Sequence, residues 1–241
     1  MQTVGEDGGN ELNSHTLTLA NSKSTLMTPR DVYLLLSRKS VISAFSDSGY
    51  PVHRNENYQP FFIVGSGRAG TTLLRRLLVD SNTSIAPEVY GTNTVIRSFL
   101  KTNYIASWKS ICEQTISVLG SRSYCEGQFL SSLLTSVIPK AVDILPNERS
   151  LASLINHFHQ EYAKFKNGEY CLRWGDKTPV NSYRLSLIAK VFPDASYVHL
   201  IRDGVDVISS YEKAGIFSMD EAAKRWLTSI QAVESFKKKQ Q

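Results

Sequence analysis

The chain has 241 residues, of which 41% are hydrophobic and 20% charged, and its net charge is +5. This composition is typical of a folded globular protein with one substantial core, and it excludes a disordered chain. The longest apolar runs, such as residues 32–36 and 61–64, are far too short to cross a bilayer. Because no dense pattern of basic and aromatic residues indicates nucleic acid, the positive charge favours a small polyanion or an acidic acceptor as partner.

The first 57 residues are predicted to form a flexible N-terminal lead that contains one short helix. Residues 1–27 are rich in Gly, Asn, Ser and Thr, and their acidic, polar start is unlike a signal peptide. Thr28 and Pro29 can begin a helix that runs to about Phe45. Three cysteines, an odd number, favour free thiols in a reducing compartment. We therefore expect a cytoplasmic protein whose main domain spans residues 58–241.

An apolar run followed by a glycine-rich turn is the most informative segment of the chain. Residues 61–74 read FFIVGSGRAGTTLL, and a helical pattern of leucines follows the turn. In a strand, turn and helix of this kind, backbone N–H groups and the helix N-terminus can bind a phosphate. Arg68 lies within the turn, and Thr71 stands where a nucleotide triphosphatase has its lysine. The loop is thus suited to a phosphate but not to a magnesium-bound triphosphate, the alternative being a glycine-rich turn without a ligand.

The rest of the chain alternates between predicted helices and strands. In chain order, we expect helices within residues 92–166, a strand at 169–174, a helix at 181–191, a strand at 196–201, a helix after residue 204 and a last helix at 219–237. This alternation predicts an α/β fold with a parallel sheet that is covered by helices on both faces. Ligands of such folds bind at the carboxyl ends of the strands, where the turns at 65–72 and 202–210 fall.

The second of these turns, residues 201–211, reads IRDGVDVISSY. Arg202 stands at the end of a predicted strand, and Ser210 lies two helical turns further on. An arginine fork and a serine hydroxyl can together bind one phosphate. An ion pair between Arg202 and Asp203 that serves only the structure is the alternative interpretation.

The two turns together resemble those of the PAPS-dependent sulfotransferases, in the branch that includes tyrosylprotein sulfotransferase-like and bacterial carbohydrate or lipid sulfotransferases. Residues 65–74 match the family's GxxRxGTTLL loop, and residues 202–210 match its RDxxDVxxS segment. Ala69 stands where the loop usually has serine, and Val205 where the second segment often has arginine. The resemblance covers about residues 60–236. It implies a P-loop NTPase-like parallel sheet with a helical insertion on the acceptor side.

The resemblance also implies a donor site for PAPS (3′-phosphoadenosine 5′-phosphosulfate). Arg68, Thr71 and Thr72 would contact the 5′-phosphate and the transferring sulfuryl group, and Arg202 and Ser210 would bind the 3′-phosphate. The implied donor-binding residues are Gly65, Ser66, Gly67, Arg68, Ala69, Gly70, Thr71, Thr72, Arg202 and Ser210.

Two further residues match positions at which the family carries catalytic groups, and with Arg68 they form the implied catalytic set. Lys177 begins a K-T-P turn like the family's, where a lysine can neutralise charge on the departing oxygen; the alternative is a surface turn cap. Glu88 lies, within about one residue, where the tyrosine-sulfating branch has the glutamate that accepts the acceptor's proton. A charge at a helix N-terminus is the alternative for Glu88.

The sequence thus predicts a transferase that moves the sulfuryl group of PAPS to a hydroxyl of a carbohydrate, lipid or tyrosyl acceptor, without a metal. One alternative is a nucleotide-binding or interaction protein of the same fold that has lost catalysis. A second is a P-loop small-molecule kinase with Asp203 as a metal ligand, which the missing lysine disfavours. The strand and loop that usually follow the last helix in the family are absent from these 241 residues, so we expect an incomplete sheet edge.

Overall fold

The computed structural model describes residues 49–54, 56–80 and 82–240. The helix predicted from Thr28 to Phe45 lies outside these residues. The start of the described chain is attached to the helical region, because the backbone N–H groups of Leu151 and Ala152 donate to the carbonyls of Pro51 and Val52, at 3.1 and 2.9 Å. The segment before the first strand therefore packs along the N-terminus of a long helix.

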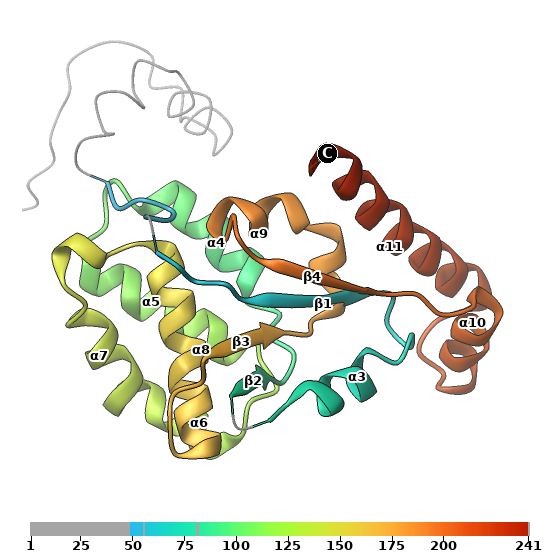
Figure 1. The fold of residues 1–241 in the computed structure, drawn as a ribbon, viewed down its shortest axis with the longest axis horizontal. Coiled ribbons are helices and arrows are strands. Elements are labelled where there is room, and N and C mark those ends of the chain that lie inside the picture. The colour runs from blue at the N-terminus through green and yellow to red at the C-terminus, as the bar shows by residue number, and fades with distance from the viewer. Residues whose placement is uncertain (1–48, 55, 81, 241) are drawn as a thin grey trace, which may run out of the picture. The chain divides into compact units, whose positions relative to one another are not determined.

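Four parallel strands form the sheet at the centre of the described structure, as Figure 1 shows. They are β1 (Phe61–Gly65), β2 (Thr83–Ala86), β3 (Arg173–Asp176) and β4 (Ser196–Leu200). Their order across the sheet is β2-β3-β1-β4, with β1 paired to β3 on one side and to β4 on the other. The parallel sheet that the sequence predicts is thereby confirmed.

The two faces of β1 contact different helices. Phe61 and Ile63 pack with Leu74 of the helix that directly follows the glycine-rich turn. Phe62 and Val64 alternate with them and join the large core on the other face of the sheet. Every residue of β1 is buried, which explains why the strand is apolar throughout instead of alternating.

Helices surround the sheet (Figure 1). The α-helices are α3 (Thr71–Leu78), α4 (Thr92–Thr102), α5 (Trp108–Ser121), α6 (Gly127–Ser132), α7 (Ile138–Val142), α8 (Leu151–Asn167), α9 (Leu185–Val191), α10 (Gly204–Lys213) and α11 (Met219–Gln240). A π-helical turn, Leu133–Val137, and two 3₁₀ turns, Pro146–Glu148 and Pro179–Tyr183, join some of them. Among the helices described, none is long and apolar enough to cross a membrane.

The helical region between β2 and β3 shares one core with the sheet. Phe99, Ile116 and Phe158 from α4, α5 and α8 are buried in the same cluster as Phe62 and Trp174 of the sheet. Aromatic side chains fill much of this cluster, as the edge-on contact between Phe62 and Trp174 at 6.0 Å illustrates. The predicted helical character of residues 92–166 is confirmed.

The third strand begins and ends later than its sequence predicts. A strand in this region is confirmed, but the predicted bounds of 169–174 were wrong, because β3 runs from Arg173 to Asp176. Glycine and aspartate are disfavoured in strands, which is why the pattern ended the strand at Trp174. The structure explains the glycine: Phe61 lies opposite Gly175, and an ideal Cβ on Gly175 would stand 2.5 Å from the Phe61 ring.

Two other segments also differ from their predicted structure. β2 was not predicted, because four residues with a single large apolar side chain are too few to show a period of two. The helix predicted at 181–191 is divided into the 3₁₀ turn Pro179–Tyr183 and α9. Arg184 separates the two with a non-helical φ of −134°.

The three cysteines are packing residues in the described structure. Cys112, Cys125 and Cys171 are all buried and not disulfide-bonded. Burial raises the pKa of the Cys112 thiol to about 12 and that of Cys125 to about 11. Each is therefore a neutral thiol at physiological pH and an inert part of the core.

Candidate active site

The glycine-rich turn between β1 and α3 has a backbone that L-residues rarely adopt. Gly65, Arg68 and Gly70 have positive φ angles of 149°, 67° and 100°. An ideal Cβ on Gly65 would stand 2.4 Å from the carbonyl oxygen of Leu200, so glycine is required where β1 passes β4. Arg68 holds the left-handed conformation with a full side chain, which costs about 1–3 kcal/mol. Such strain persists where the surroundings fix the chain, as they do here.

Gly67 lets a helix from the second motif approach the loop. An ideal Cβ on Gly67 would stand 2.1 Å from the hydroxyl oxygen of Tyr211 in α10. Tyr211 is itself buried, and its ring packs on Phe217 at 5.3 Å. The two turns that the sequence singles out are therefore in direct contact.

A buried serine fixes the point at which β1 enters the loop. The Ser182 hydroxyl donates to the carbonyl of Gly65 at 3.0 Å and accepts from its N–H at 2.8 Å. Ser182 lies in the 3₁₀ turn after β3, and only 1% of its surface is exposed. The sequence analysis did not find this residue, because nothing in the local pattern around it indicates a contact with β1.

The first turn of α3 offers free backbone donors. Gly70 caps this helix, and among the described residues no side chain bonds to the cap and the first turn carries no acidic residue. The Thr71 side chain is buried, whereas Thr72 is exposed. The N–H groups and the positive end of the helix dipole are thus available to an anion.

Arg68, Arg202 and Ser210 meet beside this helix start. The Arg68 Nε donates to the Ser210 hydroxyl at 3.0 Å, and an Arg202 Nη donates to the Arg68 carbonyl at 3.3 Å. Arg202 also pairs with Asp206 at 3.1 Å. These residues line a cavity of about 430 Å³ together with Ser209, Lys213 and Ala214. The lining thus holds three cationic side chains, Arg68, Arg202 and Lys213, and one carboxylate, Asp206, so the cavity has a net positive charge.

Asp203 serves as the N-cap of α10. Its carboxylate accepts from the backbone N–H groups of Val205 and Asp206, at 2.9 and 3.3 Å. A side chain that completes the first turn of a helix in this way is engaged in structure. The geometry therefore gives no support to Asp203 as the metal ligand of a kinase.

Lys177 and Glu88 form an ion pair on the other side of the loop. The Lys177 ammonium contacts Glu88 Oε1 and lies 3.2 Å from the Thr72 hydroxyl. Only 4% of the Lys177 side chain is exposed, against 21% for Glu88. The structure thus places the lysine between a carboxylate and the first turn of α3, not in a surface turn.

Tyr90 is a further contact of Glu88. Its hydroxyl donates to Glu88 Oε2 at 2.5 Å. Burial and this hydrogen bond raise the pKa of Tyr90, so the phenol is neutral and acts as a donor. The segment is held by an antiparallel bridge between Val89 and Ser123, which ties the end of β2 to the end of α5. Glu88 is therefore fixed by a donor on each oxygen.

The order of the strands sets the order of these groups along one edge of the sheet. Glu88 follows β2, Lys177 follows β3, the glycine-rich loop follows β1, and Arg202 follows β4. Because the strands are parallel and ordered β2-β3-β1-β4, all four groups lie at the carboxyl edge in this sequence. A carboxylate and a lysine stand on one side of the glycine-rich loop, and an arginine stands on the other.

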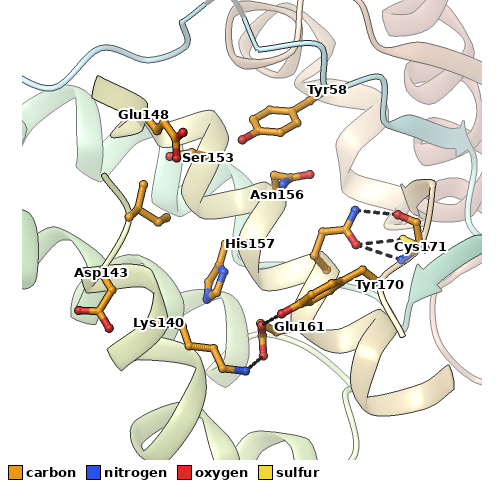
Figure 2. A pocket seen from close by; sticks show the side chains of 12 residues that line it. Tyr58, Lys140, Asp143, Glu148, Ser153, Asn156, His157, Glu161, Tyr170 and Cys171 are labelled. Atoms are coloured by element: carbon orange, nitrogen blue, oxygen red, sulfur yellow. Dashed lines mark hydrogen bonds and ion pairs between the residues drawn. The ribbon is translucent and has the colours of Figure 1, made fainter. Parts of the chain in front are cut away.

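A larger cavity, of about 630 Å³, lies elsewhere. Figure 2 shows it beside Tyr58 and Cys171, which precede β1 and β3, so it is near the amino ends of the strands. Its polar wall is the pair of Lys140 and Glu161 at 2.6 Å, with the Tyr170 hydroxyl donating to Glu161 at 2.8 Å. None of the predicted site residues lines it, and besides the pair of Lys140 and Glu161 its lining includes the carboxylates of Asp143 and Glu148.

The predicted site residues thus form two groups around the loop. Two members of the loop turn their side chains into the protein: Ser66 donates to the carbonyl of Gly67 at 3.0 Å, and Ala69 packs in a small cluster with Val207. Both can contact a ligand through the backbone alone.

In the residues that the structure describes, no group of three or more His, Cys, Asp or Glu side chains could hold a metal ion.

Comparisons with known proteins identify relatives of this chain. The chain is 26% identical over 163 residues to the omega-hydroxy-beta-dihydromenaquinone-9 sulfotransferase Stf3 of Mycobacterium bovis (strain ATCC BAA-935 / AF2122/97) and of Mycobacterium tuberculosis (strain CDC 1551 / Oshkosh). The match covers 60% of this chain and 42% of each relative, so the chain spans less than half the length of these relatives.

A solved structure and a family model also match. The crystal structure of sulfotransferase STF9 from Mycobacterium avium is 18% identical, with a TM-score of 0.31, and the match covers 77% of this chain and 51% of that one. The family model described as the sulfotransferase family matches residues 60–241, which include every residue of the two groups around the loop. With three quarters of its length matched by that model, the chain belongs to the sulfotransferase family.

Proposed function

We propose that this protein transfers the sulfuryl group of PAPS to a hydroxyl group of an acceptor. The observation that carries the proposal is the order of groups at the carboxyl edge of the sheet. A basic cavity at Arg202 and an ion pair of Lys177 with Glu88 stand on opposite sides of the start of α3, where no side chain bonds to the cap. A donor with a 3′-phosphate near one end and a sulfuryl group at the other matches this order.

The donor would be bound by two sets of groups. The guanidinium of Arg202 and the Ser210 hydroxyl line one cavity, and together they suit the 3′-phosphate. The free N–H groups at the start of α3, with the Thr71 and Thr72 side chains beside them, suit the 5′-phosphosulfate. Neither set requires the lysine of a triphosphatase loop.

The reaction proposed is an in-line displacement at sulfur. The acceptor oxygen attacks sulfur while the bond from sulfur to the 5′-phosphate oxygen breaks, and Glu88 takes the proton of the acceptor hydroxyl. The electron pair of the broken bond stays on the phosphate oxygen, where Lys177 and Arg68 stabilise the negative charge. A sulfuryl group carries one fewer negative charge than a phosphoryl group, so these cations and backbone donors can supply the stabilisation.

The acceptor would approach from the helical region, because Glu88 lies directly before α4. We infer an alcohol or phenol on a carbohydrate, a lipid or a tyrosyl peptide. The Mycobacterium relatives are named for a hydroxylated dihydromenaquinone, which makes a lipid alcohol the first acceptor to test.

The test is calorimetric titration with 3′-phosphoadenosine 5′-phosphate, the product of donor turnover, beside ADP and Mg-ATP. We expect binding that requires the 3′-phosphate and does not require magnesium. Equal binding of ADP would contradict the proposed donor site.

The variant Arg202→Ala should bind this nucleotide about ten- to hundredfold more weakly, because one charge-assisted hydrogen bond contributes 1.5–3 kcal/mol. Lys109→Ala is the matched control: it removes one positive charge from an exposed position on α5, where Lys109 pairs weakly with Glu113 at 4.0 Å. An Arg202→Ala affinity equal to that of the control would remove Arg202 from the donor site.

A further inference from the structure

Asp176, the last residue of β3, is completely buried, yet the reaction described above does not use it. Its carboxylate accepts from the Thr178 hydroxyl at 2.6 Å and from the Asn181 amide at 2.9 Å. The Thr92 hydroxyl lies 3.4 Å from its second oxygen. An ionised carboxylate has no proton to donate, so it can serve all of these donors at once.

Through Thr178, this carboxylate reaches the segment that carries Glu88. The Thr178 hydroxyl donates its proton to Asp176 and accepts from the backbone N–H of Val89 at 2.8 Å. Val89 directly follows Glu88, and its carbonyl lies 3.2 Å from the Thr92 hydroxyl. The residue next to Glu88 is therefore tied to Asp176 through the Thr178 hydroxyl, whereas the single proton of the Thr92 hydroxyl can go either to the Val89 carbonyl or to Asp176.

The same contacts fix the backbone of Lys177 on both sides. Asp176 precedes Lys177 and Thr178 follows it, and these two neighbours are hydrogen-bonded to each other. Asn181, which donates to Asp176, also closes the 3₁₀ turn, with its N–H bonded to the Thr178 carbonyl at 3.0 Å. The position of the lysine thus depends on the same carboxylate as the position of the glutamate.

A carboxylate is a costly group to use for closing a turn. Burial raises the pKa of Asp176 to about 6, so the ionised form is disfavoured inside the protein. The cationic group nearest along the chain is the ammonium of Lys177, which itself pairs with Glu88. The Thr178 hydroxyl and the Asn181 amide approach different oxygens of Asp176, so an asparagine here would present an NH₂ donor to one of these two donors.

We propose that Asp176 is a positioning residue that sets the separation of Lys177 and Glu88 through Thr178. This inference rests on the proposed function for its catalytic consequence, but the positioning itself can be measured without turnover. A correctly placed pair keeps the Lys177 ammonium buried against Glu88, whereas a displaced pair exposes it to water.

The test is competitive labelling of lysine amines with acetic anhydride, followed by mass spectrometry. Thr178→Val keeps the shape of residue 178 but removes the link between Asp176 and Val89, and Thr178→Ser keeps the hydroxyl. We expect Lys177 to label about tenfold faster in the valine variant, the equivalent of one lost charge-assisted hydrogen bond, and at the wild-type rate in the serine variant. Asp176→Asn should label like the valine variant.

Glu161→Gln is the matched control, because Glu161 is also a buried carboxylate that accepts from a lysine and a hydroxyl. The hydrogen bond to Glu161 raises the pKa of Lys140, so this variant should increase labelling of Lys140 and leave Lys177 unchanged. Turnover should fall about ten- to hundredfold in Thr178→Val, while affinity for 3′-phosphoadenosine 5′-phosphate stays the same.

The outcomes separate the two proposals. Equal Lys177 labelling in Thr178→Val and Thr178→Ser, or labelling changes that only follow the unfolded fraction, would overturn the positioning role. A different outcome would be faster Lys177 labelling in the valine variant together with no sulfuryl transfer by the wild-type protein. That result would support the positioning role and count against the proposed function.

Discussion

Two glutamates of this chain have the same kinds of partner but differ in their surroundings. Glu88 is bonded to Lys177 and Tyr90, and Glu126 is bonded to Lys166 and to the hydroxyl of Tyr162. The first pair lies at the carboxyl edge of the sheet with its lysine almost fully buried. In the second pair, both charged side chains are more than 40% exposed. Bonding pattern therefore does not separate the two glutamates, whereas the position of Glu88 beside the glycine-rich loop does, and this position is the reason we propose it as the base.

Glu126→Gln is consequently a matched control for Glu88→Gln. We expect Glu88→Gln to bind 3′-phosphoadenosine 5′-phosphate normally and to lose sulfuryl transfer, because glutamine cannot take the acceptor's proton. A radiolabelled transfer assay from PAPS measures the loss, and Glu126→Gln should transfer at the wild-type rate. Retained transfer in Glu88→Gln would remove the residue as the base.

Gly67 is a second position at which a single group decides the geometry. A methyl group added at Gly67 would collide with the Tyr211 hydroxyl, so Gly67→Ala should weaken nucleotide binding. Tyr211→Phe removes that oxygen and leaves the nearest ring carbon 3.2 Å from the new Cβ. The double variant should therefore recover most of the affinity in calorimetry. Equal affinity of single and double variants would show that the collision is not what matters.

The sequence predicts the place of residues that belong to a motif, but not of residues that contact the site from another part of the chain. The turns at 65–72 and 202–210 lie at the carboxyl ends of parallel strands, as the alternation of elements predicts. Ser182 contacts Gly65 from a position 117 residues away, and no periodicity or motif marks such a contact. These contacts depend on the register of separate strands, which a single sequence does not reveal.

At the scale of elements, α8 is joined to β3 by a stacked pair of rings. His159 lies parallel to Trp174, with ring centroids 4.0 Å apart and an interplanar angle of 1°. Among the described residues, neither ring nitrogen of His159 has a hydrogen-bond partner. Burial lowers the pKa of His159 to about 3, so the ring is neutral in the folded protein.

This pair predicts an acid sensitivity of the fold. Between pH 6.5 and pH 3 the unfolded state binds a proton at His159 and the folded state does not, so stability falls as the pH falls through this window. The loss is about 1.4 kcal/mol per pH unit. His159→Phe should keep the stack and flatten this slope in urea unfolding between pH 7 and pH 5. The exposed His53→Gln is the control, and a wild-type slope in His159→Phe would refute the assignment.

Predictions for whole elements succeeded where periodicity is long. α8 and α11 have enough turns to show a helical pattern, whereas β2 and β3 have four residues each. β3 contains Gly175 and Asp176, although both residue types are disfavoured in strands. Gly175 makes room for the Phe61 ring, and Asp176 accepts hydrogen bonds in a buried network. Tertiary contacts of this kind override propensity.

At the scale of the whole molecule, the sheet and the helical region are packed on one core. The cluster includes Phe62 of β1, Phe99 of α4, Phe158 of α8, Ile188 of α9 and Val233 of α11. The side of the molecule that we propose faces the acceptor and the side that we propose binds the donor are thus parts of one packed body. A change in the packing of the helices can reach Glu88 through the start of α4.

The strand order at the carboxyl edge also separates the residues that we propose as donor contacts from the residue that we propose as the base. The proposed donor contacts follow β1 and β4, and the proposed proton acceptor follows β2. Variation in the segment after β2 and in α4 and α5 can therefore alter which alcohol is used while the nucleotide contacts stay intact. For protein engineering, this division defines a library: diversify the surroundings of Tyr90 and Tyr124, keep residues 65–72 and 202–210 constant, and select for new acceptors with one unchanged donor.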